Sequence, residues 1–236
     1  MPIITVSGTL GSGAREIAQA AARELGLDYV DQEILVEAAR RLGVSVADVE
    51  SRDEPATGLG ERLASIMRTL MERSAVAGAS DPMSGGGLEM ILGRTYGEAA
   101  DLPSEAERGQ PDDERYLKTL TSVIRGIAAR GKVVILGRGS QAILQHEPEA
   151  LHVYVGAPTE QRIATLVQQE GMEPQDAERR LKQSDQNRQA FHRRYFKIDA
   201  DTPKLYDLML RSDRIQPDLA VKLIALAVRD RTPRPG

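Results

Sequence analysis

The feature that most constrains this chain is a glycine-rich turn between its first apolar run and its first helical pattern. Residues 3–6, Ile-Ile-Thr-Val, predict a buried strand, and the turn after it reads Gly8-Thr9-Leu10-Gly11-Ser12-Gly13. Glycines in such a turn let the backbone come close to a ligand, and successive N–H groups at the start of a helix favour an anion. The sequence therefore predicts a strand, a phosphate-binding loop and a helix, in that order.

The loop departs from the usual phosphate-binding pattern at two positions. Gly8 and Gly13 fit the spacing G-x-x-x-x-G-K-[ST], but Ala14 stands in the place of the lysine and Arg15 in the place of the magnesium-binding hydroxyl. Arg15 is the candidate substitute cation, although it points about 100° around the helix from position 14. A tight strand-to-helix turn that binds no ligand is the alternative interpretation.

Charge and cysteine content narrow the class of protein. The chain has 236 residues, a net charge of −4 and no cysteine. The negative charge argues against a general nucleic-acid or anionic-membrane binder, and the lack of cysteine excludes disulfides. No basic segment precedes the first strand, and no apolar run approaches the roughly 18 residues of a membrane helix. We therefore expect a cytoplasmic protein with no nucleic-acid or membrane partner.

Strand and helix patterns alternate along most of the chain. Strands are predicted at residues 3–6, 27–31, 133–136, 151–155 and 206–210, and helices at 14–25, 32–42, 59–74, 114–130, 159–169, 174–195 and 217–229. This alternation predicts a mostly parallel sheet covered on both sides. The glycine loop, Asp31 and Arg138 all follow predicted strands, so we expect them to share the cleft at the carboxyl ends of the strands.

Residues 76–113 break the alternation. They hold Gly85-Gly86-Gly87 and an acidic, proline-containing run, and no period is sustained. We interpret them as a flexible excursion, which is either a tolerated surface insertion or a lid or partner-binding arm.

Three motifs together resemble the cytidylate kinase-like family, bacterial relatives of CMP kinase among the P-loop nucleoside monophosphate kinases. They are Gly-Ser-Gly-Ala-Arg-Glu-Ile at 11–17, Leu-Gly-Leu-Asp-Tyr-Val-Asp at 25–31 and Val-Ile-Leu-Gly-Arg-Gly at 134–139, and the similarity continues through 151–162, 206–208 and the last helix. The resemblance implies one α/β domain over residues 1–236, with three layers and a parallel five-stranded sheet flanked by helices. It also implies a helical acceptor-binding insertion at about 32–75 and a lid-like helical region at about 174–197.

The resemblance implies a role for individual residues. The donor nucleotide would be bound by Gly8, Thr9, Gly11, Ser12, Gly13, Ala14 and Arg15. The acceptor would be bound by Asp31, Arg138, Asp185, Arg188 and Arg193. Arg15, Arg188 and Arg194 would stabilise the transferring phosphoryl group, and Asp31 would lie near the metal. One departure is that Gly139 stands where the family motif Gly-Arg-Asp has its aspartate.

Each of these residues also has a purely structural interpretation. Asp31 is a favourable N-cap for the helix that follows it. Arg138 suits a structural ion pair, and the arginines between 179 and 194 suit a solvated helix face with local ion pairs such as Asp185–Arg188.

The implied reaction is transfer of the γ-phosphoryl group of ATP, with Mg²⁺, to a nucleoside monophosphate, for which CMP is the expected acceptor. Two alternatives stay open: a weak or inactive nucleotide-binding pseudo-kinase with a regulatory role, and a small-molecule kinase with a non-nucleotide acceptor. The sequence is also compatible with a homodimer.

Overall fold

The computed structural model of the protein describes residues 1–53 and 113–230. The chain divides into two compact units, one of residues 1–31 and 121–236 and one of residues 32–120. The division falls within helix α7 (Asp113–Ala128). The helix predicted at 59–74 and nearly all of the excursion predicted at 76–113 lie outside the described residues.

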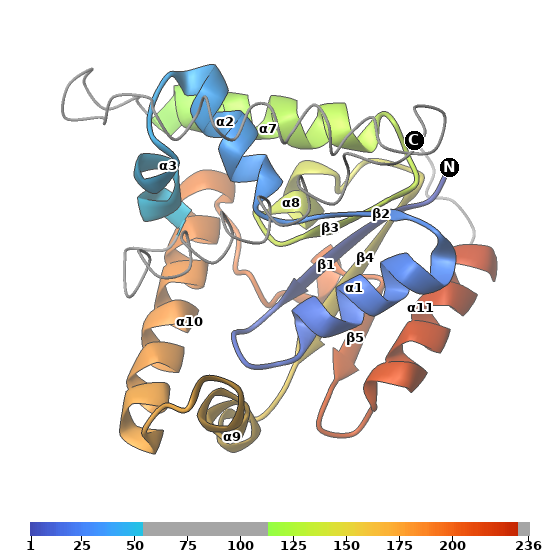
Figure 1. Ribbon diagram of the computed structural model, residues 1–236. Coiled ribbons are helices and arrows are strands. Elements are labelled where there is room, and N and C mark those ends of the chain that lie inside the picture. The colour runs from blue at the N-terminus through green and yellow to red at the C-terminus, as the bar shows by residue number, and fades with distance from the viewer. Residues whose placement is uncertain (54–112, 231–236) are drawn as a thin grey trace, which may run out of the picture. The chain divides into compact units, whose positions relative to one another are not determined.

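The first unit is built on a five-stranded sheet (Figure 1). Its strands are β1 (Ile3–Gly8), β2 (Asp28–Val30), β3 (Val133–Leu136), β4 (Ala150–Gly156) and β5 (Leu208–Arg211). They lie in the order β2-β3-β1-β4-β5, and every neighbouring pair is parallel. The predicted α/β class with a parallel five-stranded sheet is confirmed. Strand β2 begins one residue later and β5 two residues later than predicted. Because β1 is central, the loop after it lies between the loops that follow β3 and β4.

One face of the sheet is apolar. Ile4 and Val6 of β1 lie in register with Leu151 and Val153 of β4, and all four side chains are buried. Helices α1 (Ala14–Leu25) and α11 (Pro217–Asp230) lie side by side over this face (Figure 1) and complete its core. Each large aliphatic side chain buried here contributes about 1.5–3 kcal/mol. This core fixes α1, and with it the loop that precedes α1.

The opposite face of the same two strands is polar, because alternate side chains of a strand point to opposite faces. Thr5 and Ser7 of β1 lie in register with His152 and Tyr154 of β4. Thr5 Oγ1 and His152 Nδ1 are 2.7 Å apart and form a hydrogen bond inside the protein. This face presents hydroxyl, imidazole and phenol groups to the rest of the first unit.

Three further helices and one 3₁₀ turn complete the first unit: α8 (Ser140–Ile143), α9 (Thr159–Glu170), α10 (Pro174–Phe196) and η2 (Pro203–Leu205). Helices α9 and α10 pack together through Leu166, Ala177 and Leu181. Both were predicted within a residue or two of their ends, whereas the short α8 was not predicted.

The second unit contains α2 (Glu33–Leu42), α3 (Val46–Asp53) and the first half of α7. Helix α3 was not predicted, although its start has a recognisable signal. Ser45 Oγ accepts a hydrogen bond from the N–H of Asp48 at 3.1 Å, and the Asp48 carboxylate accepts one from the N–H of Ser45 at 3.1 Å. This reciprocal cap is the aspartate version of the S-x-x-E capping box.

The turn after β3 explains the missing aspartate of the Gly-Arg-Asp motif. Gly137, Arg138 and Gly139 all have left-handed backbone conformations, with φ of 69°, 58° and 67°. A Cβ atom on Gly139 would clash with Cε2 of Phe196 on α10. Glycine is therefore strongly favoured at 139, because the backbone is left-handed and the Phe196 ring occupies the space that a side chain would need.

Replacing Gly139 should destabilise the protein more than replacing a glycine that has the same φ but free space. Gly171, with φ of 66°, has nothing within 4 Å of an added Cβ and is the matched control. Gly171→Ala should cost about 1–2 kcal/mol of unfolding free energy from left-handed strain alone. Gly139→Ala should cost about 1–3 kcal/mol more from the clash with Phe196. Urea unfolding measures both, and equal losses would contradict the packing argument, as would a Phe196→Ala background that fails to reduce the difference.

Candidate functional site

The phosphate loop leads directly into α1. Gly13 is the N-cap residue of α1, and its φ of 77° matches that of Gly11 at 75°. No side chain caps the helix at this position, and the first intrahelical bond runs from the N–H of Ile17 to the Gly13 carbonyl at 3.0 Å. The N–H groups of the first helical turn therefore have no intrahelical acceptor. Together with the helix dipole they form a site suited to an anion.

Two hydroxyl groups of the loop support this interpretation. Thr9 Oγ1 and Ser12 Oγ are buried and make no hydrogen bond within residues 1–53 and 113–230. Buried hydroxyls in native proteins are normally paired. Thr9 lines the cavity described next. Ser12 Oγ instead lies close under Gly8, 3.0 Å from the position of an added Cβ.

A cavity of about 470 Å³ opens beside the loop within the first unit. Its size is in the range of small-molecule sites. Its walls come from the phosphate loop, the ends of β4 and β5, α9, α10 and the segment after α10. The lining residues are Thr9, Tyr154, Gly156, Ala157, Pro158, Arg162, Asp185, Arg188, Gln189, Asp201 and Arg211. Three arginines and two aspartates thus line a cavity that adjoins the predicted phosphate-binding loop.

Arg15 and Asp31, predicted as cation and acceptor residue, lie together in the structure. Arg15 Nη2 is 2.8 Å from Asp31 Oδ2, with the arginine half exposed and the aspartate side chain only 8% exposed. Tyr29 Oη also donates to Asp31 at 3.3 Å. The N-cap of α2 is Gln32, with no side-chain cap. The structural interpretation of Asp31 as a helix cap is therefore replaced by an ion pair with Arg15.

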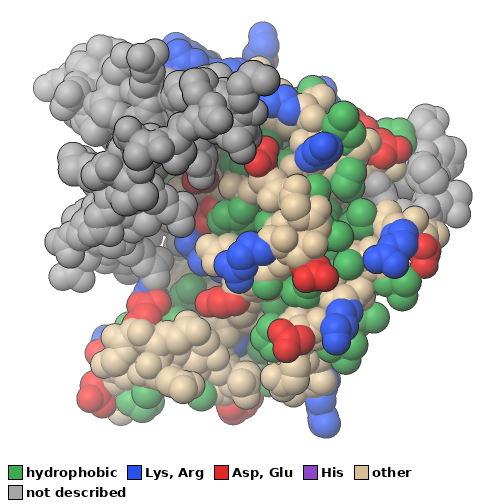
Figure 2. Space-filling model, turned by 45° about the vertical axis from the view of Figure 1, so that its right-hand side comes forward, with side chains coloured by type: hydrophobic (Ala, Val, Ile, Leu, Met, Phe, Trp, Pro, Cys, Tyr) green, Lys and Arg blue, Asp and Glu red, His purple; other side chains and the backbone are tan. Residues whose placement is uncertain are grey.

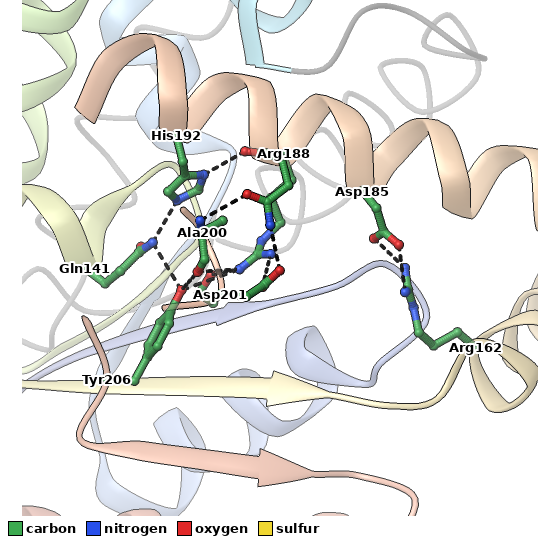
Figure 3. A network of polar contacts seen from close by, with 10 residues as sticks. Gln141, Arg162, Asp185, Arg188, His192, Ala200, Asp201 and Tyr206 are labelled. Carbon is green, nitrogen blue, oxygen red and sulfur yellow. Dashed lines mark hydrogen bonds and ion pairs between the residues drawn. The ribbon is translucent and has the colours of Figure 1, made fainter. Parts of the chain in front are cut away.

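Arg188 belongs to a network of polar contacts at the cavity wall (Figure 3). Its guanidinium contacts Asp201 Oδ1 at 2.5 Å and donates to the Ala200 carbonyl at 3.1 Å and to Tyr206 Oη at 3.4 Å. It also lies over the Tyr154 ring, 5.3 Å from its centre, on the polar face of the sheet. These contacts hold the guanidinium at the wall of the cavity.

Burial and charge shift the pKa values of this cluster. Burial acts to lower the pKa of Arg188, but the hydrogen bond and charge of Asp201 outweigh it, so the net shift is upward. Burial, with the nearby Asp201 charge, raises the pKa of Tyr154 to about 12. Burial likewise raises the pKa of Tyr206. Arg188 is therefore a fixed positive charge beside two tyrosines that stay protonated at neutral pH.

A second layer of the network fixes the backbone of α10 at Arg188. His192 Nδ1 donates to the Arg188 carbonyl at 2.8 Å, and Gln141 of α8 donates to His192 Nε2 at 2.8 Å (Figure 3). With the Gln141 amide nitrogen facing the ring, Nε2 must accept, which requires neutral histidine. Burial lowers the pKa of His192, which agrees with the neutral form.

The remaining predicted arginines lie elsewhere. Arg193 pairs with Asp199 at 2.9 Å on an exposed surface, and Arg194 lies over the Tyr195 ring at 5.4 Å. Arg138 is half-buried in the left-handed turn after β3. The lining of the cavity includes none of these three side chains. Their phosphate-binding roles stay predictions.

Asp185 pairs with Arg162 of α9 rather than facing the cavity alone. The contact is bidentate, with N–O distances of 2.9 and 2.7 Å. Among residues 1–53 and 113–230, no group of three or more His, Asp or Glu side chains is placed to hold a metal ion. The expected metal role of Asp31 stays a prediction.

Two surface properties bear on the expected partners. In the described ranges no helix is both long and apolar enough to cross a membrane. On the face shown in Figure 2, acidic and basic side chains are scattered among hydrophobic ones, and neither sign gathers into a patch.

The profile of the cytidylate kinase-like family matches residues 3–214, which include the phosphate loop, the turn after β3, the cavity and the Arg188 network. The chain belongs to the cytidylate kinase-like family. The resemblance read from the three motifs is thus confirmed. No curated protein sequence matches the chain.

Solved structures resemble this cytidylate kinase-like protein in fold. An uncharacterized protein from Eubacterium ventriosum has a TM-score of 0.62 at 15% identity, covering 98% of this chain and 100% of its own. Shikimate kinase from Acinetobacter baumannii, in complex with shikimate, has a TM-score of 0.47 at 13% identity and covers 98% and 95%. Shikimate kinase from Bacteroides thetaiotaomicron has 0.46 at 13% identity and covers 97% and 98%. The first of these shows a shared fold.

Three residues of the site were missed in the sequence. Arg162, His192 and Tyr206 all bond to groups at the cavity wall. Arg162 and Tyr206 fall inside the stretches that carry the family resemblance, which was the available signal. His192 had no metal-ligand spacing, and only the fold brings it to Gln141, 51 residues earlier.

The neutral His192 predicts a pH dependence of stability. The unfolded chain protonates this histidine near pH 6.5, whereas the folded protein resists protonation because burial lowers the pKa. Its contribution is therefore complete above about pH 6.5 and is lost as the pH falls below that value, with a slope of at most about 1.4 kcal/mol per pH unit.

Urea unfolding between pH 7.5 and 5.5 checks this prediction. The stability advantage of the wild-type protein over His192→Gln should shrink as the pH falls. The exposed His146 provides the control, and His146→Gln should follow the wild-type profile. A constant difference between wild type and His192→Gln would show that the group is not held neutral.

Proposed function

We propose that this protein transfers the γ-phosphoryl group of ATP to a nucleoside monophosphate, with CMP as the acceptor. The observation that carries the proposal is the uncapped N-terminus of α1 beside a cavity lined by three arginines. Family membership supports the same class of reaction. Phosphoryl transfer needs mainly positioning and charge neutralisation, which such a site can supply.

In this proposal the backbone of the loop holds the phosphates of ATP. Gly8 to Gly13 and the first-turn N–H groups replace part of the hydration of the anion. The lysine position is Ala14, so positive charge has to come from arginines. Arg188, already fixed by Asp201, is the strongest candidate at the cavity, and Arg15 shares its charge with Asp31.

Mg²⁺ would enter with the nucleotide in this mechanism. The described residues offer no preformed carboxylate cluster for the metal. Mg²⁺ keeps several waters and is often held by substrate phosphates plus one or two carboxylates. Asp31 is the proposed carboxylate, and its ion pair with Arg15 would then have to rearrange. The metal would neutralise charge on the phosphates.

A coupled assay with Mg-ATP and each nucleoside monophosphate tests the reaction. CMP should be the best acceptor, with CDP and ADP as products. Arg188→Lys keeps the charge but loses the paired N–H donors of the planar guanidinium, and it should lower turnover about 100- to 1,000-fold. Arg179→Lys is the matched control on the same helix, because Arg179 is exposed and pairs with Asp176 away from the cavity. Absence of turnover with every monophosphate would reject the proposal.

The loop itself is tested by Gly13→Ala. An added Cβ at Gly13 meets no protein atom within 4 Å, just as at Gly171. Both variants should therefore lose a similar unfolding free energy of about 1–2 kcal/mol. Only Gly13→Ala should weaken ATP binding, by tenfold or more, about 1.4 kcal/mol, because its methyl group intrudes on the phosphates. Isothermal calorimetry measures the affinities for ATP. Unchanged affinity in Gly13→Ala would contradict the proposal that this loop binds the phosphates.

The second candidate function is a nucleotide-binding pseudo-kinase with a regulatory role. Ala14 and the engagement of Asp31 by Arg15 favour it, since both remove groups that an active kinase uses. Tight ATP binding that Mg²⁺ does not change, with no turnover, would support it. A kinase with a non-nucleotide acceptor would instead bind ATP while CMP fails to bind.

A further inference from the structure

Arg162 connects three parts of the first unit. It lies on α9, and only 6% of its side chain is exposed. Its Nε donates to the carbonyl oxygen of Leu10, in the phosphate loop, at 2.7 Å. Its Nη1 and Nη2 donate to the two carboxylate oxygens of Asp185 on α10 (Figure 3). One guanidinium therefore bonds to the loop and to α10 at the same time.

The same part of the loop packs on α9 and α10 through apolar and backbone contacts. The Leu10 side chain packs against the core formed by Leu166, Ala177 and Leu181. A Cβ atom on Gly11 would lie 2.8 Å from the backbone oxygen of Arg162, so loop and α9 backbones touch directly. The tip of the phosphate loop, Leu10 and Gly11, thus packs against α9 and α10. The two ends of the loop are fixed by β1 and α1.

The geometry of this contact requires arginine. A buried cation needs partners for its donors, and the planar fork of arginine serves a carboxylate and a separate carbonyl together. A lysine ammonium at this position would keep the charge, but its point-like head cannot reproduce the bidentate contact with Asp185 while bonding to Leu10.

We propose that Arg162 is a positioning residue that sets the conformation of the phosphate loop, and that Asp185 holds Arg162 in place for this task. The Asp185 carboxylate then serves the protein rather than the acceptor, in contrast to the role implied by its place in the family motif. The effect on ATP affinity rests on the proposed function, but the effect on the loop does not.

Hydrogen exchange without nucleotide tests the loop directly. The Ser12 amide, which donates to the Thr9 carbonyl at 3.1 Å, reports the loop conformation. In Arg162→Ala, amides of residues 9–13 should exchange roughly tenfold to a hundredfold faster, as expected for loss of hydrogen bonds to a charged group. Arg162→Lys should give nearly the same acceleration, and it keeps the test usable if the alanine variant fails to fold.

Arg180→Ala is the matched control. Arg180 of α10 pairs with Glu170 of α9, so this variant also breaks an α9–α10 ion pair, but Arg180 is bonded to Glu170 and Met172 rather than to the loop. Loop exchange should stay at the wild-type rate. Equal acceleration in Arg180→Ala and Arg162→Ala would assign the effect to general loosening of α9 and α10 and would overturn the proposal, as would no acceleration in Arg162→Ala or Arg162→Lys.

ATP titration of Asp185→Asn separates positioning from simple charge. If Arg162 were a phosphate-binding cation restrained by Asp185, neutralising the aspartate would tighten ATP binding. The positioning role predicts the opposite, a loss of roughly tenfold together with faster loop exchange. Tighter binding in Asp185→Asn, or full recovery of affinity in Arg162→Lys, would overturn the proposal.

The two readouts separate this inference from the proposed function. If the wild-type protein binds no ATP but its loop exchange accelerates in the Arg162 variants, the kinase function fails and the positioning role stands. If ATP binds and the loop amides exchange at the wild-type rate in the Arg162 variants, the positioning role is rejected and the proposed kinase function is not.

Discussion

The pairing of β1 with a parallel neighbour on each side is the constraint on which the rest of the structure depends. Hydrogen bonds to β3 and β4 fix the register of β1, and with it the point along the sheet at which β1 ends. They also bring the turns at 137–139 and 156–158 to the same edge of the sheet. The phosphate loop leaves from this edge, and the core beneath α1 fixes the direction of the helix that follows. A backbone anion site results, because the N-terminus of α1 is held with its N–H groups uncapped.

The polar face of β1 and β4 has a different consequence. It allows a charged helix, α10, to be held by hydrogen bonds and ion pairs as well as by apolar contacts. Arg188 contacts Ser7 and Tyr154 of these strands, and its charge is compensated by Asp201. Buried charges are stable only with such partners. The cluster at the cavity is therefore preorganised, and an anionic ligand would meet a guanidinium that is already in position.

The predictions about the site named individual residues but not the partners that those residues have in the structure. The sequence indicated that Arg15, Asp31, Asp185 and Arg188 matter near a phosphate loop. In the structure Arg15 pairs with Asp31, while Asp185 and Arg188 line the cavity. Nothing in the sequence indicated that Asp185 is held by Arg162 or Arg188 by Asp201. Such pairs join side chains on different elements, and neither charge patterning nor spacing reveals which opposite charges meet.

The sequence by itself determined the strand–loop–helix start, the parallel α/β class and the family, because glycine spacing and apolar periodicity are local properties of the backbone. Helices α3 and α8 were not predicted, because both are too short to show a periodic pattern. A local signal was present for α3, since Ser45 and Asp48 cap its start. Only the tertiary structure decided the clash that a side chain at 139 would meet, the neutral state of His192 and the anchoring of Leu10. Each depends on a group that arrives from a distant part of the chain, Phe196, Gln141 or Arg162, so packing and burial rather than local propensity set the outcome.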